Sequence, residues 1–350
     1  MKKNQTSVVQ VRDLKLGGDN PVRVQSMCDT DTRDVKATVE QILSLEKAGC
    51  EIIRVAVPDM KAAKAIGEIK KQINIPLVAD IHFDYKLALE SIRQGVDKVR
   101  INPGNIGSEE KVKAVVEACK KKGVPIRIGV NGGSLEKELV EKYGHTPKAA
   151  VESCLKHVHI LEKLNFYNIV LSIKFSEVKP MIASYRLLSK KVNYPLHLGI
   201  THAGTMLTGS IKNAIGIGTL LEEGIGATIR VSLTAPLEEE VRTGWAILEA
   251  LEERKRGPKL ISCPTCGRTE IDMMSLTEQV EKALQKTKKP ITVAVMGCVV
   301  NGPGEAKEAD VGVAGGRGKG VIFTKGKIVK TLKEKDLLPA LLEEIEKIDQ

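Results

Sequence analysis

Short runs rich in Val, Ile and Leu alternate with longer amphipathic stretches along the first 255 residues of the chain. Short apolar runs with β-branched side chains are typical of buried strands, and apolar positions at helical spacing are typical of amphipathic helices. The predicted strands cover residues 22–27, 51–57, 76–81, 98–102, 126–131, 168–174, 195–200 and 228–233. Helices are predicted between them, for example at 34–48, 108–122 and 207–223.

The regular alternation of strands and helices indicates a parallel sheet, and eight such units over roughly 250 residues indicate a closed (β/α)8 TIM barrel. We therefore predict an α/β barrel domain over residues 1–255. A doubly wound open sheet is the rival arrangement. It is disfavoured because no Gly-x-Gly-x-x-Gly motif follows the first predicted strand.

A charged run at 252–259 is broken by Gly257 and Pro258, which predicts a linker between two domains. Beyond it, residues 260–350 are predicted to form a small α+β domain. A bound cluster can supply much of the stability of a domain of this size. The predicted elements are helices at 275–286 and 334–348 and strands at 291–296, 311–314, 320–324 and 327–329.

No apolar run approaches the roughly 20 residues that a membrane span requires, and the N-terminus carries no apolar signal segment. We therefore expect a soluble, cytoplasmic protein without a membrane partner. The formal net charge of +10 invites a nucleic-acid partner, but only 3% of residues are aromatic, which disfavours base stacking. An anionic small molecule or an acidic protein accounts for the charge equally well, so no nucleic-acid partner is expected.

The seven cysteines are odd in number and follow no secretion signal, so a disulfide framework is not expected. Four of them stand alone in predicted strands or helices and are predicted to be buried apolar side chains: Cys28, Cys50, Cys119 and Cys154. The other three lie in two glycine-rich segments, as Cys263-x-x-Cys266 and as Cys298 ahead of Asn301-Gly302-Pro303-Gly304-Glu305.

A Cys-x-x-Cys pair occurs in zinc sites, thioredoxin-like sites and iron–sulfur sites. The thioredoxin-like motif follows the first strand of its own fold, whereas this pair follows a linker. A zinc site usually has four Cys or His ligands, but no histidine lies beyond His202. The fourth ligand is then a carboxylate, a solvent molecule or absent, and Glu305 is the leading candidate because residues 301–304 can turn the chain back. An iron–sulfur cluster and a zinc ion both remain open from spacing alone.

The glycine-rich stretch 315–320 resembles a phosphate-binding loop, but it does not match the Gly-x-x-x-x-Gly-Lys-Ser/Thr pattern. A tight turn between two strands of the small domain is the better interpretation.

Polar residues end most of the predicted barrel strands. In a TIM barrel these ends form the active-site mouth. The cations are Arg54, Arg100, Arg127, Lys174 and Arg230, and the other polar residues are Gln25, Ser26, Asp80, His82, Asn102, Asn131, Ser172, His197, His202 and Ser232. Five cations at one end of a barrel repel one another unless an anion lies between them, and arginine binds phosphate oxygens in pairs. We therefore predict a phosphate or diphosphate ligand there.

The alternative is that each arginine pairs with a neighbouring carboxylate at the rim, although Asp80 is one of few acids at the strand ends. Three histidines are predicted at the mouth, where they can exchange protons near neutral pH: His82, His197 and His202. The remaining three are predicted to be structural or solvated: His145, His157 and His159.

Seven motifs and the two cysteine segments, in this order, resemble the 4-hydroxy-3-methylbut-2-enyl diphosphate synthase family over nearly the whole chain. This family carries out a reductive step of the methylerythritol phosphate route to isoprenoids. The motifs are VRVQSM at 22–27, RVAVP at 54–58, ADIHF at 79–83, RINPGN at 100–105, GVNGGSL at 129–135, LHLGIT at 196–201 and RVSL at 230–233.

The resemblance implies a 4Fe-4S cluster in domain 260–350, held by Cys263, Cys266, Cys298 and Glu305. It also implies that 2-C-methyl-D-erythritol 2,4-cyclodiphosphate binds in the barrel. The implied contacts are Arg54, Asp80, Arg100, Asn102, Arg127, Asn131, Lys174, Arg230 and Ser232. The implied reaction is a two-electron reductive ring opening and dehydroxylation to 4-hydroxy-3-methylbut-2-enyl diphosphate.

The resemblance further implies an electron donor, ferredoxin or flavodoxin, and a homodimer in which the cluster domain of one subunit closes over the barrel of the other. Two other functions remain as alternatives. One is a zinc-stapled barrel that binds polyanions without catalysis, and the other is a zinc-dependent lyase or aldolase, which the lack of histidine ligands disfavours.

One position departs from the family pattern: the usual Thr-Glu-Ala-Gly is Thr201-His202-Ala203-Gly204 in this chain. His202 therefore stands where the resemblance implies a catalytic acid/base glutamate. Either His202 transfers the proton, which its intrinsic pKa permits, or the change impairs turnover. Impairment is favoured because carboxylate and imidazole differ in charge, reach and geometry.

Overall fold

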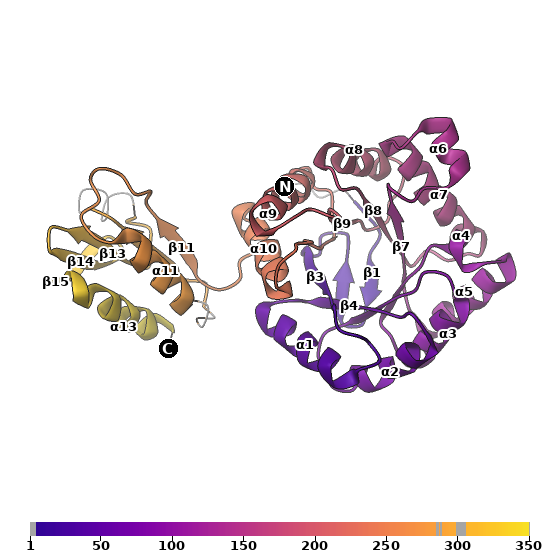
Figure 1. Cartoon of the computed structure of the whole chain (residues 1–350), viewed down its shortest axis with the longest axis horizontal. Helices are drawn as coiled ribbons and strands as arrows, with labels where there is room; N and C mark the ends of the chain where they lie inside the picture. Colours follow the sequence, from indigo (N-terminus) through magenta and orange to yellow (C-terminus); the bar gives the residue numbers. More distant parts are fainter. Residues whose placement is uncertain (1–4, 285–286, 288, 299–305, 350) are drawn as a thin grey trace. The chain divides into compact units, whose positions relative to one another are not determined.

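The chain folds into two units with separate hydrophobic cores, Met1–Arg254 and Lys255–Gln350. They are seen in the computed structural model of Figure 1, which describes residues 5–284, 287, 289–298 and 306–349. Among these residues, none of the helices is both long and apolar enough to cross a bilayer.

The first unit is a barrel of parallel strands in the order β8-β7-β6-β5-β4-β3-β10-β9. An isolated parallel bridge between Leu171 and Leu196 joins β8 to the segment entering β9 and closes the ring. The strands are β3 (Arg23–Met27), β4 (Ile52–Ala56), β5 (Leu77–Asp80), β6 (Lys98–Arg100), β7 (Ile126–Asn131), β8 (Ile169–Lys174), β9 (His197–Leu198) and β10 (Thr228–Ile229). The predicted (β/α)8 barrel is confirmed.

Helices surround the strands as a ring (Figure 1). They are α1 (Val35–Ala48), α2 (Met60–Lys70), α3 (Tyr85–Arg93), α4 (Pro103–Ile106), α5 (Glu109–Lys122), α6 (Lys137–Tyr143), α7 (Pro147–Lys163), α8 (Val178–Ser189), α9 (Met206–Glu222) and α10 (Leu237–Ala250). Local signals set their ends. In α1, the Asp34 side chain accepts a hydrogen bond from the backbone N–H of Ala37, and Gly49 ends the helix with φ 109°.

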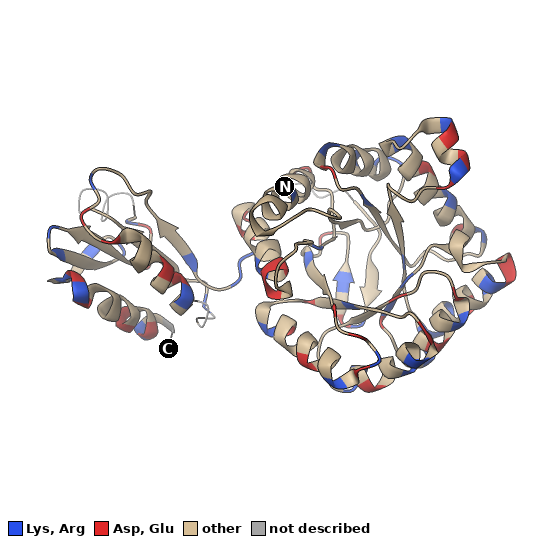
Figure 2. Ribbon diagram, in the orientation of Figure 1, with Lys and Arg blue, Asp and Glu red and all other residues tan. Residues whose placement is uncertain are grey.

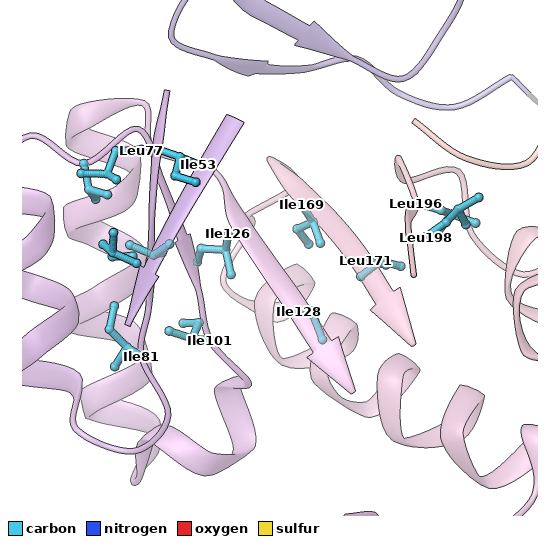
Figure 3. Packing of buried hydrophobic residues seen from close by; sticks show 14 of the residues in the cluster. Ile53, Leu77, Ile81, Ile101, Ile126, Ile128, Ile169, Leu171, Leu196 and Leu198 are labelled. Atoms are coloured by element: carbon cyan, nitrogen blue, oxygen red, sulfur yellow. The ribbon is translucent and has the colours of Figure 1, made fainter. Parts of the chain in front are cut away.

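The main core lies between the strands and the helices. Successive side chains of a strand point to opposite faces, so one set packs outward against the helices and the other enters the barrel. Figure 3 shows the outward packing around Ile53, Leu77 and Ile101. These positions alternate with the polar residues on which the site depends.

A hairpin of β1 (Val9–Val11) and β2 (Leu14–Leu16), which was not predicted, closes one end of the barrel. Its apolar side chains pack with Ile52, Val78, Val170 and Ala227, which lie at or near the starts of barrel strands. The amino-terminal end of the barrel therefore has an apolar floor.

The second unit is a five-stranded sheet with helices, so the predicted α+β domain is confirmed. In the order β11-β12-β13-β14-β15, the first three strands run parallel and the last three antiparallel. The elements are β11 (Lys259–Ser262), α11 (Met273–Leu284), β12 (Thr292–Met296), β13 (Val311–Gly316), β14 (Lys319–Thr324), β15 (Lys327–Lys333), the 3-10 helix η1 (Glu334–Asp336) and α13 (Leu337–Asp349). Residues 317–318 connect β13 to β14, which confirms the predicted turn.

The predicted linker at 252–259 contains the boundary between the two units, but the connection is shorter than predicted at both ends. Arg254 belongs to the barrel, because Nη1 donates to the carbonyl of Val22 at 2.7 Å and to Glu51 Oε2 at 2.6 Å, and its guanidinium lies over the Trp245 ring. Lys259 already begins β11, whose apolar run is too short to stand out in the sequence.

Candidate functional site

The barrel cations enter the interior because they alternate with outward-facing apolar residues. On β4, Arg54 lies between Ile53 and Val55, and on β6 Arg100 follows Val99. The three apolar neighbours belong to the core between strands and helices. The same alternation turns Arg127 of β7 and Lys174 of β8 inward. Figure 2 shows both signs of charge along the surrounding helices. The buried charged side chains of the barrel, in contrast, are mostly cations.

Asp80 is the carboxylate inside this ring, and two arginines share it. Arg100 Nη1 donates to Asp80 Oδ1 at 3.1 Å, and Arg54 Nε lies 3.6 Å from Oδ2. Burial of Asp80 opposes its ionisation, but Arg54, Arg100 and Arg127 outweigh burial and lower its pKa. The carboxylate therefore stays charged and orients two guanidinium groups.

Gly129 makes room for Arg100. Arg100 Nη2 donates to the Gly129 carbonyl at 2.6 Å, and a Cβ on this glycine would lie 2.6 Å from Arg100 Nε. Asn102 forms hydrogen bonds with both backbone polar groups of Gly129: its Nδ2 donates to Gly129 O at 3.0 Å and its Oδ1 accepts from Gly129 N at 2.9 Å. Arg100 and Asn102 are thus positioned from one backbone unit.

Glu240 of α10 orients Arg230 and was not identified from the sequence. Its Oε2 lies 3.7 Å from Arg230 Nη2, and its Oε1 accepts from the backbone N–H of Leu233 at 2.8 Å. Burial raises the pKa of Glu240, while Arg230 opposes the rise. A glutamate in the first turn of a helix gave no sequence signal for this role.

The rim-pairing alternative applies to part of the ring only. Arg54, Arg100 and Arg230 have carboxylate partners, but within the described part of the chain Arg127 and Lys174 form no ion pair. Burial and the neighbouring arginines hold the pKa of both groups well below their usual values. The cationic excess suits an anionic ligand with several oxygen atoms.

Asn102 and Asn131 line one pocket at the mouth, next to Ser134 and His157. Ser232 follows β10 and is half-buried. His82 lies at the mouth as predicted, with Nδ1 3.1 Å from Arg100 Nη1. His202 is exposed in the loop after β9 and has a left-handed backbone, with φ 52°.

The prediction that His197 lies at the mouth is wrong. His197 is fully buried, its Nδ1 lies 2.7 Å from Thr228 Oγ1, and Thr228 pairs in register with Arg23, the first residue of β3. This row is in the lower half of the barrel. His157 is structural, as predicted, since its Nδ1 accepts from the backbone N–H of Gly104 at 3.0 Å.

In the second unit, Cys263 and Cys298 follow neighbouring parallel strands, because Ser262 of β11 pairs in register with Val295 of β12. Cys263 Sγ accepts a hydrogen bond from the Gly297 N–H at 3.2 Å. Cys266 is exposed, and hydrogen bonds from the backbone and side chain of Arg268 lower its thiol pKa. The N–H donor to the Cys263 sulfur and the lowered pKa of Cys266 both favour the thiolate form.

Glu305 lies outside the described residues. Among the residues that are described, no three His, Cys, Asp or Glu side chains already form a metal-binding group. The thiolate donors suit a soft metal or an iron–sulfur centre in their chemistry. The four isolated cysteines are buried, as predicted, and burial raises each thiol pKa to about 12, so they are inert: Cys28, Cys50, Cys119 and Cys154.

These features define a two-domain protein: a TIM barrel with a cationic mouth suited to phosphates and a small α+β domain that carries three cysteines in two short segments. The chain belongs to the GcpE family. The family model described as the GcpE TIM-barrel domain matches residues 6–245, and the one described as the GcpE protein C-terminal domain matches residues 259–347.

Curated relatives match along almost their whole length. The 4-hydroxy-3-methylbut-2-en-1-yl diphosphate synthase (flavodoxin) of Caldanaerobacter subterraneus subsp. tengcongensis is 64% identical over 98% of this chain and 97% of its own. Proteins of the same name from Clostridium perfringens and Clostridium acetobutylicum are 60% and 59% identical over 99% of this chain, and over 100% and 99% of their own lengths. The family resemblance seen in the motifs is confirmed.

Proposed function

We propose that this protein is a 4-hydroxy-3-methylbut-2-en-1-yl diphosphate synthase of isoprenoid precursor biosynthesis. It would open and dehydroxylate 2-C-methyl-D-erythritol 2,4-cyclodiphosphate with two electrons. The observation that carries the proposal is the near-full-length identity to synthases of this name, and the cationic barrel mouth agrees with a diphosphate substrate.

The cyclic diphosphate would bind at the ring of cations. Arg54 and Arg100 are held by Asp80, and Arg230 is held by Glu240, so these three guanidinium groups are oriented before substrate arrives. Arg127 and Lys174 would gain the most from phosphate charge because they are buried among like charges. Asn102, Asn131 and Ser232 would contribute neutral hydrogen bonds at the rim.

We assign the 4Fe-4S cluster to Cys263, Cys266, Cys298 and Glu305. Support comes from the strand-end positions of Cys263 and Cys298, the N–H donor to the Cys263 sulfur and the lowered pKa of Cys266. When bound, such a cluster passes electrons one at a time to a substrate. Flavodoxin, or ferredoxin, would supply them, and the net charge of +10 favours docking of an acidic carrier.

His202 occupies the position where the family resemblance implies a glutamate. Its left-handed backbone conformation is one that His adopts more readily than most residues, so the change fits the local chain. We propose that the imidazole replaces the carboxylate poorly in proton transfer and that turnover is reduced.

We further propose a homodimer in which the cluster domain of one subunit serves the barrel of the other. We also propose a cytoplasmic location, because a reducing compartment keeps the cysteines of such a site from forming disulfides.

Anaerobic purification followed by iron, sulfide and turnover measurements tests the function. We expect iron and sulfide in equal amounts, broad visible absorption, and product formation with reduced flavodoxin. Protein that lacks iron and this absorption would reject the cluster. Bound zinc with salt-sensitive RNA or DNA binding would instead favour the non-catalytic polyanion-binding alternative.

A further inference from the structure

Five polar side chains of the barrel strands are almost fully buried, each at most 2% exposed: Gln25, Lys98, Arg127, Ser172 and His197. Buried polar atoms are nearly always hydrogen-bonded. Within residues that the structure describes, however, Lys98 Nζ, Ser172 Oγ and His197 Nε2 have no hydrogen-bond partner, and neither do two guanidinium nitrogens of Arg127 or either amide atom of Gln25. This set of side chains is therefore polar but not satisfied by the protein itself.

Lys98 is the most unusual member of this set. It is the first residue of β6 and pairs in register with Val78, a residue of the apolar floor. The carboxylate of its neighbour Asp97 already has two partners. Its Oδ2 lies 2.5 Å from Lys70 Nζ and accepts a hydrogen bond from the backbone N–H of Leu77 at 2.7 Å. The Lys98 amine thus points into the barrel, between the floor and the mouth.

Among the described residues Lys98 forms no ion pair, and the charge of Asp97, which is paired with Lys70, offsets only part of the repulsion that Lys98 experiences. Arg127 of β7 and Arg54 of β4 repel the Lys98 ammonium. His197 of β9 is also close enough to be repelled by Lys98 when its imidazole is protonated. Asp80 of β5 is shared by Arg54 and Arg100. Burial first, and then Arg127 and Arg54, lower the pKa of Lys98 to about 7.

We propose that Lys98 couples anion binding in the barrel to proton uptake. A phosphate or diphosphate group entering among Arg127, Arg54 and Lys174 supplies the missing negative charge, and one proton passes from solvent to Lys98 Nζ. No other bond forms or breaks. The inference rests on the proposed function only in that both take the barrel as an anion-binding site. Lys98 is a positioning residue, because its charge acts on the bound anion without taking part in the reaction.

Calorimetric titration of the full-length, cluster-loaded protein with inorganic sulfate tests the coupling. Sulfate keeps its charge near neutral pH, so protons exchanged on binding come from the protein. Titrations at pH 8 in two buffers with different ionisation enthalpies give the number of protons. We expect uptake of about one proton per sulfate bound at pH 8, falling toward zero at pH 6.

Four variants assign the proton. Lys98→Met and Lys98→Arg should take up about one proton fewer per sulfate than the native chain, because methionine has no amine and arginine does not deprotonate. Any uptake by Lys174, which is also buried among arginines, should remain in both variants. His197→Asn should retain uptake, as should the control Lys137→Met on the exposed helix α6. Thermal melts identify any variant that fails to fold, and the wild-type titration remains decisive in that case.

Uptake in Lys98→Met equal to that of the native chain, or loss of uptake in His197→Asn, would overturn the inference. Sulfate binding to the wild-type chain without uptake would overturn it and leave the proposed function intact. Absence of saturable sulfate binding would also overturn the inference, because the buried cations would then not bind the anion that is to drive proton uptake; product formation with reduced flavodoxin tests the proposed function separately.

Discussion

Arg100 and Asp80 form a buried ion pair at the barrel mouth, with 3.1 Å between Nη1 of the arginine and Oδ1 of the carboxylate. The pair is not isolated, because Arg54 approaches the other oxygen and Gly129 accepts from the same guanidinium. One carboxylate therefore holds two cations in place within a site that is otherwise short of negative charge.

Asp80→Asn should destabilise the protein by about 3 kcal/mol, because it leaves two buried guanidinium groups without a counter-charge. The native pair contributes stability above the unfolded pKa of the carboxyl, and that contribution is lost as pH falls through the lowered folded pKa. Denaturant unfolding at pH 7 measures the loss. The control Asp31→Asn removes an exposed surface partner of Arg33 and should destabilise the protein far less, because solvent screens this pair. Equal losses for the two variants would contradict the buried-pair account.

Gly129→Ala should raise KM for the cyclic diphosphate about tenfold or more, because the new Cβ displaces the Arg100 guanidinium. Iron content should not change. Gly133→Ala, in the turn just after β7, is the matched control, since nothing lies within 4 Å of its added Cβ. Steady-state kinetics on both variants decide the matter, and an unchanged KM in Gly129→Ala would show that Arg100 does not need this space.

Serine at Cys263, Cys266 or Cys298 should remove most of the bound iron, because each change replaces a thiolate ligand. Iron analysis and visible absorption after anaerobic purification measure the loss. Cys119→Ala is the control, since Cys119 is buried in α5 and its pKa is raised to about 12. A serine variant with full iron content would remove that cysteine from the ligand set.

His202→Glu should increase turnover at least about tenfold if the imidazole is a poor substitute for the implied acid/base glutamate. His159→Glu, an exposed position on α7, controls for the added charge. His202→Gln distinguishes the alternatives, because it abolishes activity only if the imidazole itself transfers the proton. A glutamate form no faster than the native chain would refute impairment.

Lys98→Met should stabilise the protein at pH 6.5, with a gain that shrinks as pH rises. The native Lys98 has a pKa of about 7, below its unfolded value near 10.4, so the unfolded chain binds more protons between these two pH values. Native stability relative to Lys98→Met therefore rises with pH across this window, by up to a few kcal/mol. Denaturant unfolding at several pH values tests this, and parallel curves for the two proteins would contradict it.

Local patterns predicted most of the barrel. Alternating β-branched runs and amphipathic stretches located the eight strands, because each strand–helix unit is decided within about 30 residues. The hairpin Val9–Leu16 and strand β11 were missed, since both are too short to show a period. His197 was misplaced for a different reason: residue order indicates which strand a side chain is on, but not its depth in the barrel.

The sequence by itself determined the barrel, the strand ends that carry cations and the cysteine segments, because these follow from periodicity and spacing along the chain. Only the tertiary structure decided which charges are compensated. Glu240 behind Arg230, Gly129 beneath Arg100 and the unpaired Lys98 depend on strand register and on contacts between distant segments, such as Ser26 with Glu240. Which charges meet inside a barrel depends on the register of neighbouring strands and on how distant segments pack. The local order of residues along the chain does not show this.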